Sequence, residues 1–264
     1  MMPVNDEGSP ALLDVRDGTA LITLSGPARN ALDEAMVAAI SAAFDAAEAD
    51  ESVRCVVLTG AGPAFCSGAV LSTLIDSAEG RFDDVVAVYE GFLRVRRSPL
   101  PTIAAVNGPA VGAGLNLALA CDVRVASTQA LFESRFPVLR LHPGGGHTWL
   151  LTRAIGRQRA TMMSLFGEVL DAEVALGAGL VAAVHSPETL LEEAMTLARR
   201  VEDLERDFVE NLTSTLRAAE ESPDHEGVLA LETQRQRWST TRPAFLSATR
   251  ALQARIAGRA GAAR

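Results

Sequence analysis

Apolar and polar positions near the start of the chain follow two different periods. Residues 11–25 contain two short runs of roughly alternating, β-type character on either side of Asp17-Gly18, a pair suited to a hairpin turn. Residues 31–50 instead repeat Ala, Met, Ile and Phe at helical spacing, and Asn30 stands where a side chain would cap that helix. The chain is therefore expected to open with a β-hairpin followed by an amphipathic helix.

Strand and helix periods continue to alternate up to about residue 187. Continuous apolar runs at 55–59 and 102–106 predict buried strands. The other elements expected in this region are helices over 84–98, 112–121, 145–155 and 158–166, and strands over 122–127, 130–132 and 180–184.

After Pro187 the pattern becomes helical throughout, with polar faces rich in Arg and Glu. Helices are expected over 188–203, 206–220, 225–238 and 243–258. Strands that alternate with helices indicate an α/β protein, and the later run of helices indicates a separate α-helical part. The expected organisation is an α/β core over residues 1–190 and a C-terminal helical region over residues 191–264.

Composition narrows the range of partners. The 264-residue chain is 48% hydrophobic, which is enough for one large core, and its net charge is −9. An acidic protein disfavours nucleic acid and anionic membranes as partners, so a small-molecule substrate is expected. All 24 basic residues are Arg, and the absence of Lys excludes Schiff-base enzymes, pyridoxal phosphate enzymes and P-loop NTPases.

Cysteine usage and hydropathy favour a cytoplasmic protein. The three cysteines are too widely spaced for a disulfide framework or a paired metal site, and no hydrophobic signal region follows the polar start. The longest apolar stretch, residues 103–121, is nearly long enough to span a bilayer, but it contains Asn107, Pro109, Asn116 and three glycines. It is interpreted as a strand, a loop and a buried helix, with no membrane contact.

Two glycine-containing segments, 56–71 and 103–122, each include a predicted buried strand and continue beyond it. Small residues after a strand let the backbone approach a ligand, and a helix that begins there presents free N–H groups to it. Tight packing of strand against helix is the alternative explanation for any single segment. A Rossmann fingerprint lacks its third glycine here, and a nucleophile elbow would need glycine where Phe65 stands.

Taken together and in order, these segments resemble the crotonase (enoyl-CoA hydratase/isomerase) superfamily, and the resemblance extends from about residue 11 to 255. The stretches that carry it are GPARNAL (26–32), VRCVVLTGAGPAFCSGA (53–69), the AAVNGPAVGAG block that ends at Asp122, LFESRFPVLRLHPGGG (131–146) and LLTRAIG (150–156).

The resemblance implies a crotonase-like ββα spiral core with a C-terminal α-helical region, a homotrimer or homohexamer, and an acyl-CoA thioester substrate. No separate cofactor is implied, because coenzyme A is part of the substrate. In family members the thioester oxygen sits between two backbone N–H groups, which here fall on Ala69 and Ala113. Residues implied at the CoA site are Arg29, Ser67, Gly68, Ala69, Ala113 and Arg242; solvated surface positions are the alternative for both arginines, and a structural role is the alternative for Ser67.

This chain departs from the family at the acid/base positions. Family hydratases carry glutamates where Asn116 and Phe136 stand, and neither Asn nor Phe can transfer a proton at a useful pH. Some isomerase-like members use an Asp at the position of Gly144, and the Asp that usually follows Gly68-Ala69 is replaced by Val70. None of these three arrangements of acidic residues is present in this chain.

The polar residues that remain near the expected pocket include His147 and Asn116 itself. His147 opens the helix after the glycine run, where the chlorobenzoyl-CoA dehalogenase branch of the family places a catalytic Asp. A His has a pKa near working pH and could act as general base or acid. The alternative is a helix-start His bonded to local backbone.

Glu133 and His142 complete the set of candidates. Glu133 either points into the pocket or lies outward, paired with Arg135 or Arg140. His142 and His147 are too awkwardly spaced for a metal site, and no third ligand is evident, so no metal is expected.

The leading hypothesis is an enzyme of the hydratase/isomerase class, a lyase or isomerase of fatty acid metabolism, that stabilises a thioester enolate or oxyanion. Two alternatives remain: a catalytically silent acyl-CoA-binding protein, and a CoA-thioester isomerase or hydrolase that uses His147. A Clp-type serine protease, which shares the spiral fold, ranks low because no serine has the required helix-start context with a matching His.

Overall fold

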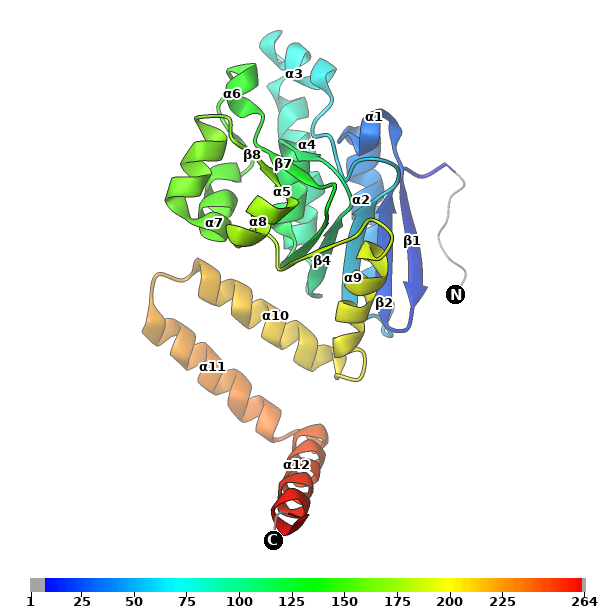
Figure 1. Ribbon diagram of the computed structural model, residues 1–264, viewed down its shortest axis with the longest axis vertical. Coiled ribbons are helices and arrows are strands. Elements are labelled where there is room, and N and C mark those ends of the chain that lie inside the picture. The colour runs from blue at the N-terminus through cyan, green and yellow to red at the C-terminus, as the bar shows by residue number, and fades with distance from the viewer. Residues whose placement is uncertain (1–7, 263–264) are drawn as a thin grey trace. The chain divides into compact units, whose positions relative to one another are not determined.

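The computed structural model describes residues 8–262, and the chain divides into two compact units between Arg206 and Asp207 (Figure 1). The elements in chain order are β1 (Ala11–Arg16), β2 (Thr19–Leu24), α1 (Pro27–Asn30), α2 (Glu34–Ala49), β3 (Cys55–Gly60), α3 (Leu71–Ala78), α4 (Phe82–Arg96), β4 (Thr102–Val106), β5 (Ala110–Val111), α5 (Ala113–Ala120), β6 (Val123–Ser127), β7 (Leu131–Glu133), α6 (Phe136–Leu139), α7 (His147–Ser164), β8 (Val169–Asp171), α8 (Ala172–Gly177), β9 (Ala183–His185), α9 (Leu190–Ala198), η1 (Arg199–Val201), α10 (Arg206–Glu221), α11 (His225–Thr240) and α12 (Pro243–Ala262).

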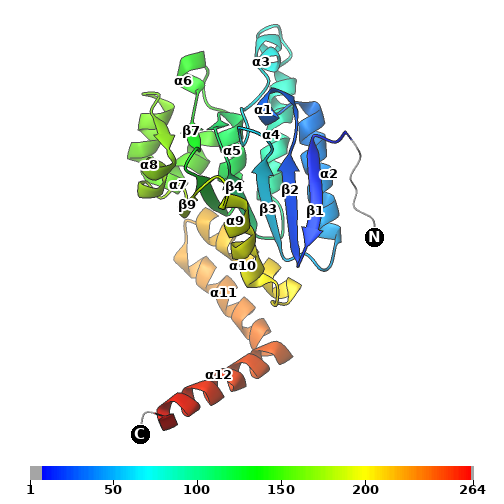
Figure 2. The same cartoon turned by 45° about the vertical axis from the view of Figure 1, so that its right-hand side comes forward.

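The first unit is built on two sheets that the chain visits in turn. The six-stranded sheet has the order β1-β2-β3-β4-β6-β9, and all of its pairs are parallel except β1 with β2. The three-stranded sheet has the order β5-β7-β8, with β5 parallel to β7. Because β4 leads to β5 and β6 leads to β7, successive turns add strands to both sheets, and the chain winds as a spiral (Figures 1 and 2).

The two faces of the large sheet are covered by different helices, as the alternation of side chains along a strand requires. Ile22, Val56 and Ala104 point to one face and pack with α2 in the main core. Val57 and Ile103 point to the other face and pack against α9. The described chain therefore divides after Arg206, whereas the sequence pattern placed the change to the helical region near residue 190.

The opening hairpin is confirmed, but the expected cap of the next helix is wrong. Asp17 and Gly18 both have positive φ, at 46° and 70°, as a two-residue turn of this kind needs. Helix α2 begins only at Glu34, because Asp33 caps it by accepting a hydrogen bond of 2.8 Å from the Met36 amide.

Asn30 has a different role from the one its position suggested. It is 1% exposed, with φ at 60°, and its side-chain amide donates to the carbonyl oxygens of Ala64 and Phe65 at 3.0 and 3.2 Å. Its side-chain oxygen accepts from the Gly26 amide at 3.0 Å. Asn30 thus ties the turn of α1 to the loop after β3, a contact across 35 residues that local pattern does not reveal.

Other differences from the expected elements are local. The helices expected over 145–155 and 158–166 form one element, α7, which is interrupted at Gly156, where φ is 72°. The last strand begins at Ala183 rather than at 180. The short elements α3, β5, β8 and α8 were not expected, since two to eight residues carry too little periodicity to identify.

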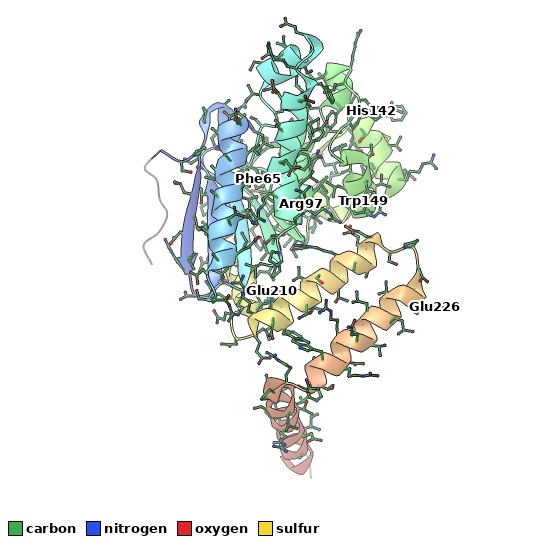
Figure 3. The ribbon with its side chains drawn as sticks, turned by 180° about the vertical axis from the view of Figure 1, so that it is seen from behind. Phe65, Arg97, His142, Trp149, Glu210 and Glu226 are labelled. Atoms are coloured by element: carbon green, nitrogen blue, oxygen red, sulfur yellow. The ribbon has the colours of Figure 1, made fainter. Side chains whose placement is uncertain are left out.

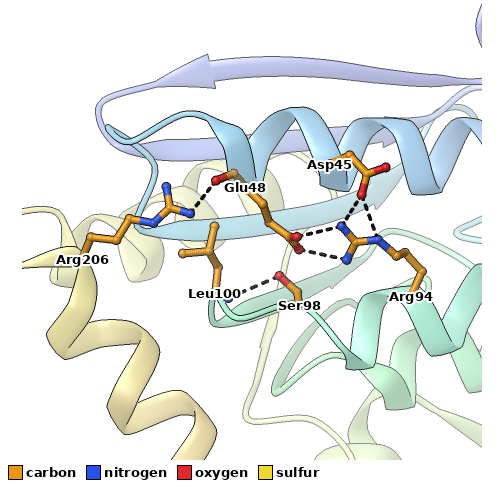
Figure 4. A network of polar contacts seen from close by, with 6 residues as sticks. All are labelled: Asp45, Glu48, Arg94, Ser98, Leu100 and Arg206. Atoms are coloured by element: carbon orange, nitrogen blue, oxygen red, sulfur yellow. Dashed lines mark hydrogen bonds and ion pairs between the residues drawn. The ribbon is translucent and has the colours of Figure 1, made fainter.

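A polar network fixes α4 against α2 (Figure 4). The Arg94 guanidinium donates to both Glu48 carboxylate oxygens, at 2.9 and 2.8 Å, and to Asp45 at 2.7 Å. It also lies 5.4 Å from the centre of the Phe44 ring. The Arg206 side chain donates to the Glu48 carbonyl oxygen at 2.6 Å. The Arg94 contacts join α4 to α2, which matters because one face of α4 lines the cavity described below.

The second unit contains α11, α12 and all of α10 but its first residue. Asp207 and Arg242 form an ion pair of 2.7 Å, and the Arg242 guanidinium lies 5.0 Å from the centre of the Trp238 ring. Among residues 8–262 no helix is long and apolar enough to cross a membrane.

Candidate active site

The two glycine-containing segments pack backbone to backbone. A Cβ on Gly108 would lie 2.2 Å from the Pro63 carbonyl oxygen, and one on Gly114 would lie 2.1 Å from the Cys66 carbonyl oxygen. The Val111 amide donates to that same Cys66 oxygen at 3.0 Å. Only glycine permits such close approach, so the small residues let the two loops pack tightly, and a ligand-binding role for these segments stays a prediction.

The backbone amides of Ala69 and Ala113 have no hydrogen-bond acceptor within the described part of the chain. Ala113 is the first residue of α5, so its N–H has no partner inside the helix. Leu32 bonds to the residues on either side of Ala69, accepting from Val70 at 3.3 Å and donating to Gly68 at 2.8 Å, which leaves the Ala69 amide unused. Both alanines line the same cavity.

The cavity has a volume of about 520 Å³ and mostly apolar walls. Its apolar side chains come chiefly from α3, α4 and the α6 region, and include Leu71, Leu74, Phe82, Val85, Val88, Phe92, Val138, Leu139 and Leu141. Arg29 and Arg135 are the charged residues that line it among those described, and no Asp or Glu does. The cavity can therefore hold an apolar chain beside an anionic group, but it offers no carboxylate for proton transfer.

Three polar side chains form a hydrogen-bonded row at the inner wall. Nδ1 of His147 lies 2.7 Å from Oδ1 of Asn116, and Nε2 lies 2.7 Å from Oγ of Ser134. Oγ of Ser164 is more distant from Nε2, at 3.3 Å. His147 is 1% exposed, and its burial lowers the pKa of the imidazole to about 4, so the ring is neutral across the physiological range.

His147, the candidate general base or acid, does not itself line the cavity. Asn116 and Ser134 line it instead, and the imidazole lies behind them. The expected alternative of a bond to local backbone is not seen either, since both ring nitrogens contact side chains. The Phe136 ring packs edge-on against the imidazole, with ring centres 4.8 Å apart.

The sequence pattern missed Ser134. Its only local signal is a short polar residue two positions after the strand expected over 130–132. Pairing of β5 with β7 brings it beside the second segment, because the Gly112 amide donates to the Glu133 carbonyl oxygen at 2.8 Å. The position of Ser134 at the end of β7 indicates a site residue only once the pairing of β7 with β5 is known.

Comparison with known proteins identifies the family. The sequence profile described as enoyl-CoA hydratase/isomerase matches residues 14–242. The chain belongs to the enoyl-CoA hydratase/isomerase family. Its spiral fold with a helical C-terminal region is accordingly that of the crotonase superfamily.

Individual relatives agree with this assignment. A probable enoyl-CoA hydratase of Mycobacterium tuberculosis is 46% identical over 93% of this chain and 98% of its own length. The 1,2-epoxyphenylacetyl-CoA isomerase of Escherichia coli is 38% identical over 72% of this chain and 75% of its own. The crystal structure of a probable enoyl-CoA hydratase/isomerase from Mycobacterium abscessus superposes with a TM-score of 0.83 at 34% identity, covering 94% of this chain and 96% of that one.

Glu133, Ser67 and Arg242, which were also expected at the site, differ in whether they line the cavity. The Glu133 carboxylate pairs with Arg135, one of the alternatives foreseen, and does not line the cavity. Oγ of Ser67 donates to the Ala28 carbonyl oxygen at 2.6 Å, which gives it a structural contact at the cavity wall. Arg242 lies in the second unit, in its pair with Asp207, and its role at a CoA site stays a prediction.

His142 is exposed in the loop between α6 and α7 and lines the cavity (Figure 3). Its Nδ1 lies 2.8 Å from the Pro143 carbonyl oxygen. The described residues contain no cluster of three or more His, Cys, Asp or Glu that could hold a metal ion. His142 contributes a polar group to the cavity lining.

Neighbouring aromatic side chains restrict the space at Gly144, the position where some isomerase-like members carry an Asp. A Cβ on Gly144 would lie 2.2 Å from the Tyr89 hydroxyl, and one on Gly145 would lie 2.4 Å from the end of the Phe92 ring. The aromatic side chains of α4 thus occupy the space that a side chain at 144 would enter. In this family member an Asp at that position would have to displace Tyr89.

Proposed function

We propose that the cavity binds an acyl-CoA thioester, and that the amides of Ala69 and Ala113 stabilise negative charge on the thioester oxygen. The observation that carries this proposal is the pair of unpartnered amides, on two separate loops, at one largely apolar cavity. Coenzyme A enters as part of the substrate, and the reaction is a lyase, isomerase or acyl-transfer step that passes through an enolate or oxyanion.

Electrostatics at the second loop favour this function. Charge develops on the thioester oxygen when the α-carbon is deprotonated or the carbonyl carbon is attacked, and donors already in place need no reorganisation to meet it. A donor of this kind is worth about 10²–10³ in rate. The N-terminus of α5 begins at Ala113 and adds partial positive charge in the same place.

The charged end of coenzyme A has a candidate partner in Arg29. This residue is exposed and lines the cavity, and its carbonyl oxygen accepts from the Ser67 amide at 3.1 Å, which anchors it to the first loop. We propose that its guanidinium contacts the CoA phosphates, because planar Arg suits phosphate oxygens.

A catalytically silent acyl-CoA-binding protein is the second candidate. The observation in its favour is the absence of Asp and Glu from the described lining of the cavity. Binding without turnover of any acyl-CoA would distinguish this candidate from an enzyme.

Acyl-CoA binding is expected to depend on the thioester carbonyl. Titration calorimetry should detect binding of at least one of acetyl-CoA, crotonyl-CoA and octanoyl-CoA, with free CoA weaker. The matched control is an S-alkyl-CoA thioether of equal chain length, which lacks the carbonyl oxygen and should bind roughly tenfold more weakly, since each hydrogen bond contributes about 0.5–1.5 kcal/mol. Equal affinity for thioester and thioether would contradict the role given to the two amides.

The protein is expected to assemble as a trimer or hexamer. Helices α10–α12 expose large apolar side chains, including Leu216 at 64%, Leu246 at 48% and Ile256 at 60%, a pattern that favours burial against another subunit. Sedimentation equilibrium should give three or six times the chain mass of 27.8 kDa. A clean monomer at micromolar concentration would count against both assembly and a CoA role for Arg242.

A further inference from the structure

The row of Asn116, His147 and Ser134 has a direction that follows from hydrogen-bonding capacity. The Asn116 side-chain nitrogen lies 3.4 Å from the Gly144 carbonyl oxygen, so its oxygen is the atom that faces Nδ1 of His147. An amide oxygen only accepts, and Nδ1 must therefore carry the ring proton. Nε2 then has a free lone pair, and Oγ of Ser134, at 2.7 Å, donates to it.

Ser134, His147 and Asn116 are thus arranged as a nucleophile, a base and a group that orients the base. Ser164 cannot fill the first role, because it does not line the cavity and its Oγ is 3.3 Å from Nε2. Ser134 does line the cavity, and it follows β7, the strand paired with β5 immediately before the Ala113 loop. Ser134 and the two alanines with unpartnered amides thus line one cavity.

The geometry points to a serine acyl-transfer site: Ser134 is the nucleophile of a thioester hydrolase, His147 is its general base and acid, and Asn116 holds the imidazole. This inference rests on the proposed function, because the acyl group must first bind with its oxygen at the amides of Ala69 and Ala113. It adds to that function a reaction type and a covalent intermediate.

The reaction balances without a further reactant. Oγ of Ser134 attacks the thioester carbon while its proton passes to Nε2 of His147, and negative charge collects on the oxygen held by the two amides. The C–S bond then breaks, and the imidazolium returns the proton to the CoA sulfur. Water attacks the resulting serine ester through the same base, which releases the carboxylic acid and restores the Ser134 hydroxyl.

Burial keeps the imidazole neutral, and Asn116 sets which ring nitrogen carries the proton. Asn fixes the ring proton on Nδ1 as an Asp would, but it adds no charge to stabilise the imidazolium. Burial lowers the pKa of His147, so the ring is ready to accept a proton at neutral pH but is a weak base. Hydrolysis is consequently expected to be slow relative to a serine hydrolase with a charged orienting residue.

The test measures release of free CoA thiol from acetyl-CoA, hexanoyl-CoA and benzoyl-CoA with a colorimetric disulfide reagent. Ser134→Ala and His147→Gln should each lower thiol release by about 10²–10⁴, the usual contribution of a proton-transfer group, with affinity for the acyl-CoA nearly unchanged. The matched control is Ser127→Ala, which removes a hydroxyl as buried as that of Ser134 but outside the cavity, and should keep wild-type turnover.

Mass spectrometry supplies a readout that a structural role for Ser134 would not give. Wild-type protein mixed rapidly with benzoyl-CoA should carry one benzoyl group on the peptide that contains Ser134, and Ser134→Ala should carry none on that peptide. Turnover that survives in Ser134→Ala, or wild-type turnover without any adduct, overturns the serine mechanism. Binding of all three thioesters with no thiol release overturns it as well and leaves the proposed binding function standing, whereas failure of every thioester to bind removes both.

Discussion

Crotonyl-CoA hydration by this protein should be about 10⁴-fold or more slower than by a family hydratase that carries both glutamates. Hydration needs one group to take a proton from water and another to deliver a proton to the α-carbon, and each contributes about 10²–10⁴ in rate. The side chains that line the cavity at the corresponding positions are Asn116 and Phe136, which can do neither. Since the amides of Ala69 and Ala113 remain, kcat should fall far more than affinity.

The measurement is the loss of enoyl absorbance of crotonyl-CoA on wild-type protein beside the Asn116→Glu, Phe136→Glu double variant. The matched control is Asn116→Gln with Phe136→Leu, which changes the same positions without adding an acid. The glutamate pair should gain hydration over both. Wild-type turnover equal to that of an ordinary family hydratase would show that these two positions do not set the chemistry.

Gly114→Ala should both destabilise the protein and disable the site. Alanine is intrinsically better than glycine in a helix, so any loss must come from the contact. The added Cβ would meet the Cys66 carbonyl oxygen at 2.1 Å, and backbone cannot yield as a flexible side chain can. Overpacking of this kind costs typically about 1–3 kcal/mol, occasionally more. Because Cys66 precedes Ala69 on the first loop and Gly114 follows Ala113, a shift of either loop separates the two amides.

Urea denaturation and calorimetry with an acyl-CoA would measure the two losses. Gly177→Ala is the matched control: Gly177 also lies in a helix, its φ is not positive, and a Cβ there would meet nothing within 4 Å. That variant should keep its acyl-CoA affinity and its stability, or gain slightly in stability. Equal behaviour of the two variants would show that the loops can separate without harm to the site.

The loops also explain why so much of the family assignment could be made from sequence. Contacts within and between the two segments require small residues at fixed positions. The resulting pattern can therefore be recognised in the sequence. The same holds for the hairpin at Asp17-Gly18, where the turn needs positive φ at two successive residues. A backbone conformation that neighbouring residues require can be predicted from the local sequence.

The roles of residues that contact distant parts of the chain were predicted less well. Asn30 looked like a helix cap because its neighbours are helical, yet its side chain bonds to the loop around Ala64. His147 was a candidate base or acid, and the sequence did not show that it contacts the cavity only through Asn116 and Ser134. A serine with a matching His was judged absent because the context sought was a helix start, whereas Ser134 follows a strand.

The sequence by itself determined the alternation of strands and helices and, through its resemblance to a known family, the spiral fold, because both depend on residue type and order along the chain. Only the tertiary structure decided which polar groups meet. Ser134 lies 13 residues from His147, and Asn116 lies 31 residues from it. The three are brought together by α5, by the β5–β7 pairing and by the start of α7, and hydrogen bonds of about 3 Å between elements are set by packing that no local period encodes.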